Sequence, residues 1–354
     1  MNLKIEWLRN KLKGMNLDGM IITNPINIEY LIGIRAEGTL LITRKENIYI
    51  TDSRYIEAVK STLTIDDGVI VNDVRNIRPD DYENFFLFCT NVGFEENHVT
   101  YARYKDLIQR YRIENMQETE NLIEQHRTIK DDEEIRRIKK ACEITDNCFS
   151  HLCKYIKKGM SEKQIAVEIE SYFKLNGAED ISFEPIVATG PNSSMPHAVP
   201  TERKVQSGDI ITIDMGCKYK GYCSDMTRTI FVDYIPEEIK PIYDLVLKNQ
   251  LSTLEEMKEG ASIKTIGKLV ENSFEFNHYQ LIHALGHGVG LTVSEGPIIS
   301  GRNSQNLKEN MVVTDEPGIY LPGKFGVRIE DTVLITKNGC ITLTNSEKNY
   351  IIIK

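Results

Sequence analysis

The sequence predicts an α/β (α+β) protein with two domains, and three observations lead to this prediction. The chain has 354 residues, which is more than one average domain needs. Its first part alternates short strand and helix patterns. Its second part contains longer helix patterns separated by long β-rich runs. We place the boundary near residue 122, so the domains are residues 1–122 and 123–354.

The N-terminal elements follow from local patterns. Apolar residues recur at helical spacing in IEWLRNKLKGM (5–15), which predicts a helix. Three β-rich runs predict strands, and EAVKSTL (57–63) predicts a short helix. The strand runs are DGMIITN (18–24), GTLLIT (38–43) and ENIYITD (46–52).

The second domain is predicted to begin with a long helix at about 131–158. Asp131 and Asp132 open it and basic residues follow, an order that suits the helix dipole. Further helices are expected at about 161–176, 236–258 and 262–275, with strands between and after them.

Composition excludes several classes of protein. The net charge of -9 argues against a nucleic-acid partner or an anionic membrane. No apolar run approaches the ~18 residues of a membrane helix, and the N-terminus lacks the apolar core of a signal peptide. The seven cysteines are odd in number and show no CxxC spacing, which indicates reduced thiols and a cytoplasmic protein.

Two aspartates lie in a predicted hairpin, DIITIDMGCKYKGYCSDMTRTIFV (209–232). A four-residue loop at 218–221 would place Asp214 and Asp225 opposite each other, with Cβ atoms ~5 Å apart. Like charges in this position are destabilising unless a positive group lies between them. In the alternative, the register differs and one aspartate faces water.

A second hairpin, MVVTDEPGIYLPGKFGVRIEDTVLIT (311–336), turns at Pro322–Gly323 and would place Glu316 opposite Glu330. Two histidines stand among glycines in HALGHGVG (283–290). Four carboxylates and an imidazole form an oxygen-rich set with enough negative charge for two divalent ions. This set favours manganese, cobalt or iron(II) over a structural zinc. The residues therefore predict metal-assisted hydrolysis.

Nine segments along the chain also carry a resemblance to a known family. They are NIEYLIG (27–33), TDSRY (51–55), RTIKDDEEIRRIKKA (127–141), ATGPNSSMPHAVPT (188–201), TIDMG (212–216), YCSDMTRT (222–229), HALGHGVGL (283–291), DEPGIY (315–320) and GKFGVRIEDTVLIT (323–336). In this order and spacing the chain resembles the pita-bread metallopeptidase family, in its prolidase (Xaa-Pro dipeptidase) and aminopeptidase P branch. The resemblance implies a creatinase-like N-terminal α/β domain and a pita-bread catalytic domain.

The resemblance also implies roles for single residues. The implied metal ligands are Asp214, Asp225, His287, Glu316 and Glu330. His197 would contact the peptide nitrogen of the scissile bond, and His283 would line the substrate pocket; the alternatives are a loop histidine and a satisfied core imidazole. Glu316 would also shuttle a proton. Tyr320 and Arg328 would orient carboxylates, unless they are a packed side chain or a surface pair.

The implied activity is that of a di-metal exopeptidase, a hydrolase that cleaves between an N-terminal residue and proline. Its substrates would be small peptides, Xaa-Pro dipeptides or Xaa-Pro-Yaa peptides, attacked by a hydroxide that bridges two divalent metal ions. Manganese is the first choice, with Co²⁺, Fe²⁺ and Zn²⁺ as alternatives. The resemblance further implies a homodimer.

The chain departs from the family pattern at Ser294, where a histidine normally precedes the acidic residue. That histidine donates a hydrogen bond near the developing oxyanion, and losing such a donor costs ~10²–10³ in rate. Three alternatives follow: a slower enzyme, a compensated one, or a non-catalytic homologue that binds metal and peptide. Retention of all five implied ligands argues against the non-catalytic alternative.

A methionine aminopeptidase-like activity is disfavoured by the N-terminal domain. Some prolidases carry an arginine at the position of Ile298, where it suits the free carboxylate of a dipeptide. Its absence here favours longer peptides as substrates.

Overall fold

The computed structural model describes residues 2–63 and 68–354. The chain divides into two compact units, one ending at Arg127 and the other beginning at Thr128. The boundary expected near residue 122 falls at the first residue of α5 (Leu122–Arg127), the last helix of the N-terminal unit.

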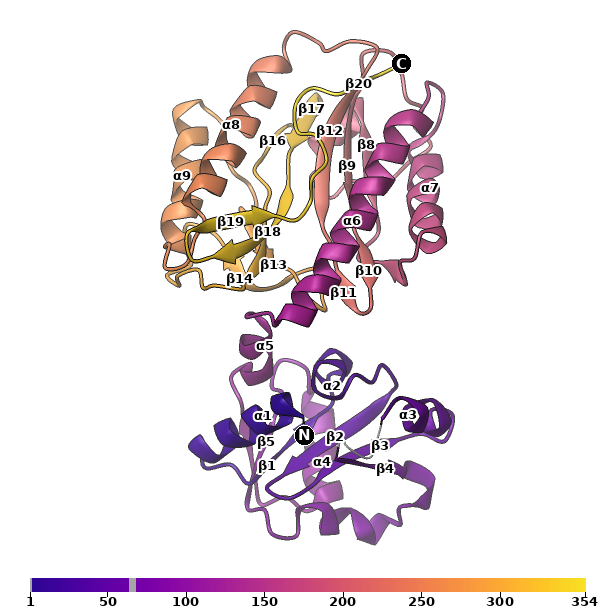
Figure 1. The fold of residues 1–354 in the computed structure, drawn as a ribbon, viewed down its shortest axis with the longest axis vertical. Coiled ribbons are helices and arrows are strands. Elements are labelled where there is room, and N and C mark those ends of the chain that lie inside the picture. Colours follow the sequence, from indigo (N-terminus) through magenta and orange to yellow (C-terminus); the bar gives the residue numbers. More distant parts are fainter. Residues whose placement is uncertain (1, 64–67) are drawn as a thin grey trace. The chain divides into compact units, whose positions relative to one another are not determined.

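The N-terminal unit is built on a mixed six-stranded sheet with the order β4-β3-β2-β1-β5-β6 (Figure 1). Before α5 its elements are α1 (Leu3–Gly14), β1 (Gly19–Ile22), α2 (Pro25–Ile32), β2 (Gly38–Thr43), β3 (Asn47–Thr51), α3 (Ile56–Thr62), β4 (Val69–Asp73), β5 (Asn91–Phe94), α4 (Tyr101–Tyr111) and β6 (Asn115–Glu118). Asn2 caps α1 by accepting hydrogen bonds from the amides of Lys4 and Ile5. The two helices and three strands predicted within residues 5–63 are confirmed.

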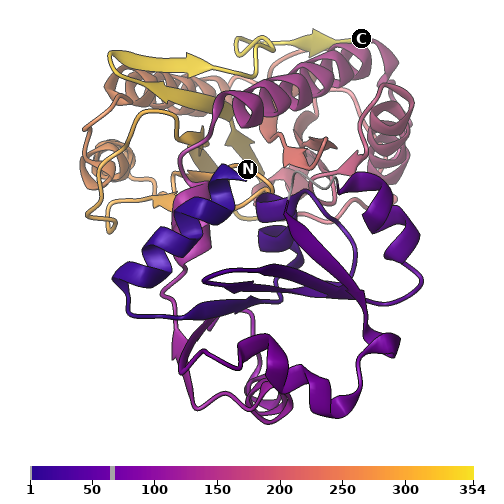
Figure 2. The same ribbon diagram turned by 60° about the horizontal axis from the view of Figure 1, so that its bottom comes forward.

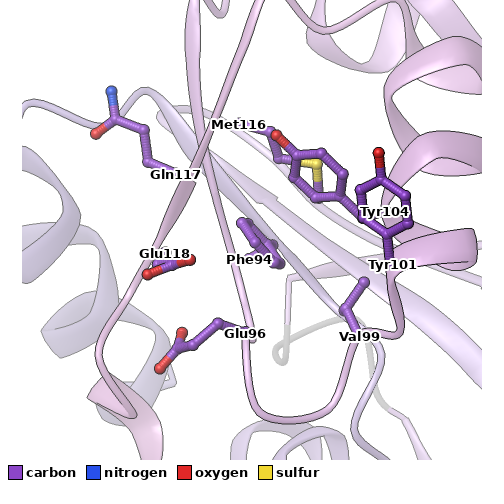
Figure 3. A pocket seen from close by; sticks show the side chains of 8 residues that line it. All are labelled: Phe94, Glu96, Val99, Tyr101, Tyr104, Met116, Gln117 and Glu118. Atoms are coloured by element: carbon purple, nitrogen blue, oxygen red, sulfur yellow. The ribbon is translucent and has the colours of Figure 1, made fainter.

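A pocket of about 540 Å³ lies in this unit between the loop after β5, the start of α4 and the edge strand β6 (Figure 3). Phe94, Tyr101 and Tyr104 line it together with Glu96 and Glu118. None of the candidate metal ligands lies in this unit.

The second unit has two halves, each with a pair of helices on its own sheets (Figures 1 and 2). The first half contains α6 (Asp132–Tyr155), α7 (Glu162–Leu175), β7 (Asp180–Ile181), β8 (Ile186–Thr189), β9 (Ile210–Met215), β10 (Cys217–Tyr219), β11 (Tyr222–Cys223) and β12 (Met226–Val232), joined by the C-terminal β20 (Ile352–Ile353). The second half contains α8 (Lys240–Glu256), α9 (Ile263–Phe276), β13 (Gly286–Gly288), β14 (Glu295–Ile299), β15 (Val312–Asp315), β16 (Gly318–Leu321), β17 (Phe325–Arg328), β18 (Asp331–Thr336) and β19 (Gly339–Thr342). Each half has its own buried apolar cluster.

The helices of this unit begin and end within a few residues of their predicted positions. Capping boxes fix two of the starts, with Asp131 and Glu134 at α6 and Ser161 and Gln164 at α7. The seven cysteines are all free, as expected. Among the described residues, no helix combines the length and the apolar character that crossing a bilayer requires.

The two predicted hairpins differ in outcome. The register predicted around Gly323 is confirmed, because Gly318 pairs with Arg328 in one ladder and Asp315 with Asp331 in the next. The register predicted for the first hairpin is wrong by two residues, since Asp214 lies opposite Thr227. A shift of two keeps Asp225 on the same face as Asp214. Both aspartates are buried, so neither faces water.

Candidate metal centre

Three buried carboxylates form the centre of the site. Asp214 lies in β9, Asp225 directly precedes β12, and Glu330 lies between β17 and β18; one oxygen atom of each lies within 4.8 Å of those of the other two. Oδ1 of Asp214 and Oε1 of Glu330 are buried and have no hydrogen-bond partner in the protein. Buried charged oxygens without partners are costly, so the cluster calls for a cation.

His287 and Glu316 complete the cluster from the second half of the unit. Nε2 of His287 lies 3.3 Å from Oε1 of Glu316 and 3.6 Å from Oδ2 of Asp225. Nδ1 of His287 contacts the carbonyl oxygen of Gly288 at 3.2 Å, so the ring donates there and keeps Nε2 as an acceptor. Burial lowers the pKa of His287, which favours the neutral imidazole that binds metals.

The carboxylates repel one another when no cation is bound. Burial and the neighbouring carboxylates raise the pKa values of Asp225 and Glu330 well above their ordinary values. Burial raises the pKa of Glu316 to about 7. Arg328 is the cation that opposes these shifts. Four carboxylates, two of them with an unpaired oxygen, and one neutral imidazole have the chemistry that divalent metal ions require.

These raised pKa values predict how metal binding depends on pH. The folded, metal-free protein binds the proton of Glu316 more tightly than the unfolded chain, so this group makes the stability fall as pH rises from about 4.5 to about 7. A metal ion displaces the protons, so its stabilising effect grows over the same window. We expect the rise in melting temperature on adding Mn²⁺ to be larger at pH 8 than at pH 5. Scanning fluorimetry with Mn²⁺ or EDTA measures this, and an equal rise at both pH values would contradict it.

Hydrogen bonds fix the orientation of the carboxylates. The Nη2 atom of Arg328 donates to Oδ2 of Asp214 at 2.6 Å, and its Nη1 donates to the hydroxyl of Tyr320 at 2.7 Å. Thr227 donates to Glu330 at 2.6 Å and Thr314 donates to Glu316 at 3.0 Å. Sequence reasoning did not identify these two threonines as site residues. Their signal is the spacing, because Thr227 follows Asp225 by two residues and Thr314 precedes Glu316 by two, which puts each pair on one strand face.

His283 extends this chain of contacts. Its Nε2 lies 3.1 Å from the hydroxyl of Tyr320 and its Nδ1 lies 2.7 Å from the carbonyl oxygen of Ala284. Burial lowers the pKa of His283 to about 4, so the ring is neutral near pH 7. The neutral ring donates from Nδ1 to Ala284 and accepts from Tyr320 at Nε2. Both ring nitrogens are therefore engaged by the protein.

The other two predicted site residues lie at the surface of the unit. His197 is exposed, and it lies near enough to His283 to contribute to the lowered pKa of His283, after the larger effects of burial and of Arg328. Ser294 is exposed as well, and its carbonyl oxygen accepts a hydrogen bond from Thr292 at 3.1 Å. The next residue, Glu295, pairs with Gly288 in the β13–β14 ladder, so Ser294 lies beside the strand that carries His287.

A buried ion pair supports the segment that carries Ser294. Nζ of Lys130 lies 2.8 Å from Oε1 of Glu295, and the two side chains are 1% and 9% exposed. The pair ties this segment to the residues that precede α6. Sequence reasoning missed it, because 165 residues separate the partners.

Comparisons with known proteins agree with this architecture. Residues 136–337 match the model of metallopeptidase family M24, and residues 4–129 match that of the creatinase/prolidase N-terminal domain. An uncharacterized peptidase of Bacillus subtilis is 37% identical over 358 residues, which cover 99% of this chain and 100% of the relative.

Two solved structures extend the similarity to the fold. A Xaa-Pro dipeptidase from Bacillus anthracis is 35% identical, with a TM-score of 0.93 and 99% of each chain covered. An X-Pro aminopeptidase from Thermotoga maritima is 32% identical, with a TM-score of 0.89, and the match covers 97% of this chain and 100% of the other. The similarity therefore includes both units of the chain.

Proposed function

Because this chain belongs to metallopeptidase family M24 and is a metallo-exopeptidase, we propose that it hydrolyses the bond between an N-terminal residue and proline. One structural observation carries the proposal: the buried cluster of Asp214, Asp225 and Glu330, with two unpaired oxygens and with His287 and Glu316 beside it. The preference for proline is supported by relatives named Xaa-Pro dipeptidase and X-Pro aminopeptidase.

In this proposal Asp214, Asp225, His287, Glu316 and Glu330 hold two divalent ions. When bound, the ions would polarise the scissile carbonyl and activate a water molecule. Glu316 is the proton carrier, because a carboxyl group whose pKa is about 7 can accept and release a proton near neutral pH. Thr314 donates to Oε1 of Glu316 and fixes its orientation.

The neighbouring residues position the substrate. Arg328 and Tyr320 hold Asp214 and His283 in one hydrogen-bonded chain, so a substrate meets preorganised groups. We assign His197 to the leaving amine, because the residue before it, Pro196, accepts a hydrogen bond from Arg328, which also donates to Asp214. Its exposed ring is free to meet a peptide that enters from solvent.

An activity assay tests the proposal. The protein is loaded with Mn²⁺, its metal content is measured, and cleavage of Xaa-Pro dipeptides, Xaa-Pro-Yaa tripeptides and Met-Ala-Ser is followed. We expect turnover of the proline peptides and little cleavage of Met-Ala-Ser. The ratio of dipeptide to tripeptide turnover then separates dipeptidase from aminopeptidase specificity. A metal-containing protein that cleaves none of the peptides would refute the proposed activity.

Ser294 gives a second test of this function. We expect Ser294→His to raise kcat/KM by about tenfold, which is a fraction of the 10²–10³ that a well-placed oxyanion donor supplies. Ser294→Ala is the matched control, because it removes the hydroxyl without adding a donor, and it should not gain activity. An unchanged rate in Ser294→His would mean that another group already supplies the donor.

Manganese is our proposal for the native metal, supported by a ligand set with four carboxylates and one imidazole. Metal analysis of protein purified without added metal tests it, with Co²⁺, Fe²⁺ and Zn²⁺ as the competing results. We also propose a homodimer, supported by the family resemblance of the sequence. Light scattering coupled to size-exclusion chromatography measures its mass.

A further inference from the structure

The loop of residues 190–201 carries His197 and connects β8 to the following segment. It begins with a short 3₁₀ helix (Gly190–Ser194) and continues without regular structure through His197. An exposed side chain on such a loop acts on a substrate only if the loop is held in place. The structure contains an anchor for it that has no other role in the site.

The anchor is the carboxylate of Glu162, the first residue of α7, which is 0% exposed. Its Oε1 accepts hydrogen bonds from the amide of Thr189 at 2.7 Å and from the hydroxyl of Thr189 at 2.8 Å. Its Oε2 accepts from the amide of Thr201 at 2.9 Å and from the hydroxyl of Thr201 at 2.6 Å. Asn192 donates to both oxygens, at 3.0 and 3.1 Å. One carboxylate therefore joins the two ends of the loop.

Glu162 is ionised in this environment. Burial alone would raise the pKa of Glu162, but the hydrogen bonds from Thr201 and Thr189 outweigh it and lower the pKa below its ordinary value. Hydrogen bonds to an ionised acceptor are about twice as strong as neutral ones. The charge of Glu162 thus strengthens every bond that closes the loop.

The other side of the loop is held by the β16–β17 hairpin. The amide of Gly326 donates to the hydroxyl of Ser193 at 2.9 Å. Nη1 of Arg328 donates to the carbonyl oxygen of Pro196 at 3.2 Å, one residue before His197. The loop therefore lies between Glu162 and the arginine that also holds Asp214.

We propose that Glu162 is a positioning residue that sets the place of His197 relative to the metal centre by closing the loop of residues 190–201. The inference rests on the proposed function, because the role of His197 does. Glu162 bonds to the two ends of the loop, whereas Arg328 bonds to its middle and to the candidate ligand Asp214. It acts on the reaction through His197.

The first test is Glu162→Gln, which keeps the size of the side chain but removes its charge and turns one acceptor into a donor. We expect kcat/KM on an Xaa-Pro peptide to fall by about 10–100-fold, since a misplacement of about 1 Å costs up to 10²-fold. The number of metal ions bound per chain should stay unchanged. Glu168→Gln is the matched control, because Glu168 lies on the same helix and contacts His151 instead of the loop. It should keep full activity.

A double-mutant cycle with His197→Ala separates positioning from a general structural effect. If Glu162 acts through His197, Glu162→Gln lowers kcat/KM by less than about twofold once His197 is alanine. An equal fold loss in both backgrounds would overturn the proposal. If Glu162→Gln fails to fold, Thr201→Val takes its place in the double-mutant cycle. It removes one hydrogen-bond donor to the carboxylate, so the expected loss of kcat/KM is smaller.

Hydrogen exchange provides a measurement that does not need turnover. The amides of residues 190–201 should exchange faster in Glu162→Gln than in the wild type, while those of α8 and α9 stay unchanged. Equal exchange of the loop in both proteins would overturn the inference. A metal-loaded wild type that cleaves no peptide would refute the proposed function, and the exchange result would still decide whether Glu162 holds the loop.

Discussion

Asp225→Asn is expected to lose metal and to lower kcat/KM by more than about 10²-fold, which exceeds the 10–100-fold typical of residues that only support a ligand. Asp225 lies within 4.8 Å of Asp214 and Glu330 and faces Nε2 of His287. The amide keeps the shape of the side chain but removes the charge that two divalent ions require. Metal analysis of the purified variant and the peptide assay measure both effects.

Asp315→Asn is the matched control for this variant. Asp315 directly precedes Glu316, but its side chain lies on the other face of β15, where it accepts a hydrogen bond from Thr253 of α8. Burial raises the pKa of Asp315 well above its ordinary value, so its surroundings favour a neutral side chain such as the amide of asparagine. We expect its metal content and activity to remain near those of the wild type. An Asp225→Asn protein with two bound ions and full activity would contradict the ligand assignment.

Arg228→Met is expected to reduce the free energy of unfolding by about 3–5 kcal/mol, the usual effect of removing one partner from a buried ion pair. Nη2 of Arg228 donates to Asp331 at 2.7 Å, and both side chains are almost fully buried. The guanidinium also donates to the carbonyl oxygens of Glu330 and Ser346. It thereby links the segment that carries Glu330 to the C-terminal residues. Urea denaturation measures the change.

An exposed arginine provides the comparison for Arg228. The side chain of Arg136 on α6 is 67% exposed and pairs with Glu133. Surface pairs of this kind contribute less than about 1 kcal/mol, so Arg136→Met should leave the unfolding midpoint nearly unchanged. If the two variants unfold at the same denaturant concentration, the buried network around Asp331 does not stabilise the fold.

The sequence predicts the elements well where local patterns decide them. Each of the helices α6 and α7 begins with a capping box whose two residues lie three positions apart. Their starts can therefore be found without tertiary information. The register predicted for the hairpin at Gly323 is also correct. The glycine there adopts a positive φ of 71°, which suits the turn.

The first hairpin shows why register can be missed. Tyr219 pairs with Tyr222, so the loop has two residues, Lys220 and Gly221, and both have positive φ. Such tight turns usually carry asparagine or aspartate at the first position, and lysine gave no such signal. The aspartates were still brought to one face, because an error of two residues preserves the alternation of a strand.

The supporting contacts of the site could not be predicted from the sequence. The ion pair of Lys130 and Glu295 and the bond of Arg328 to Asp214 join residues more than 100 positions apart. No local pattern reports which distant segments meet. The family resemblance implies a role for Arg328 but none for Glu162.

The division of the second unit into halves has a consequence for the time at which the protein becomes active. Asp214 and Asp225 belong to the first half, whereas His287, Glu316 and Glu330 belong to the second. During synthesis the first two carboxylates leave the ribosome about a hundred residues before Glu330, and domains fold as they emerge. The proposed metal-binding set is therefore incomplete throughout that interval, and a growing chain cannot assemble it before Glu330 has emerged.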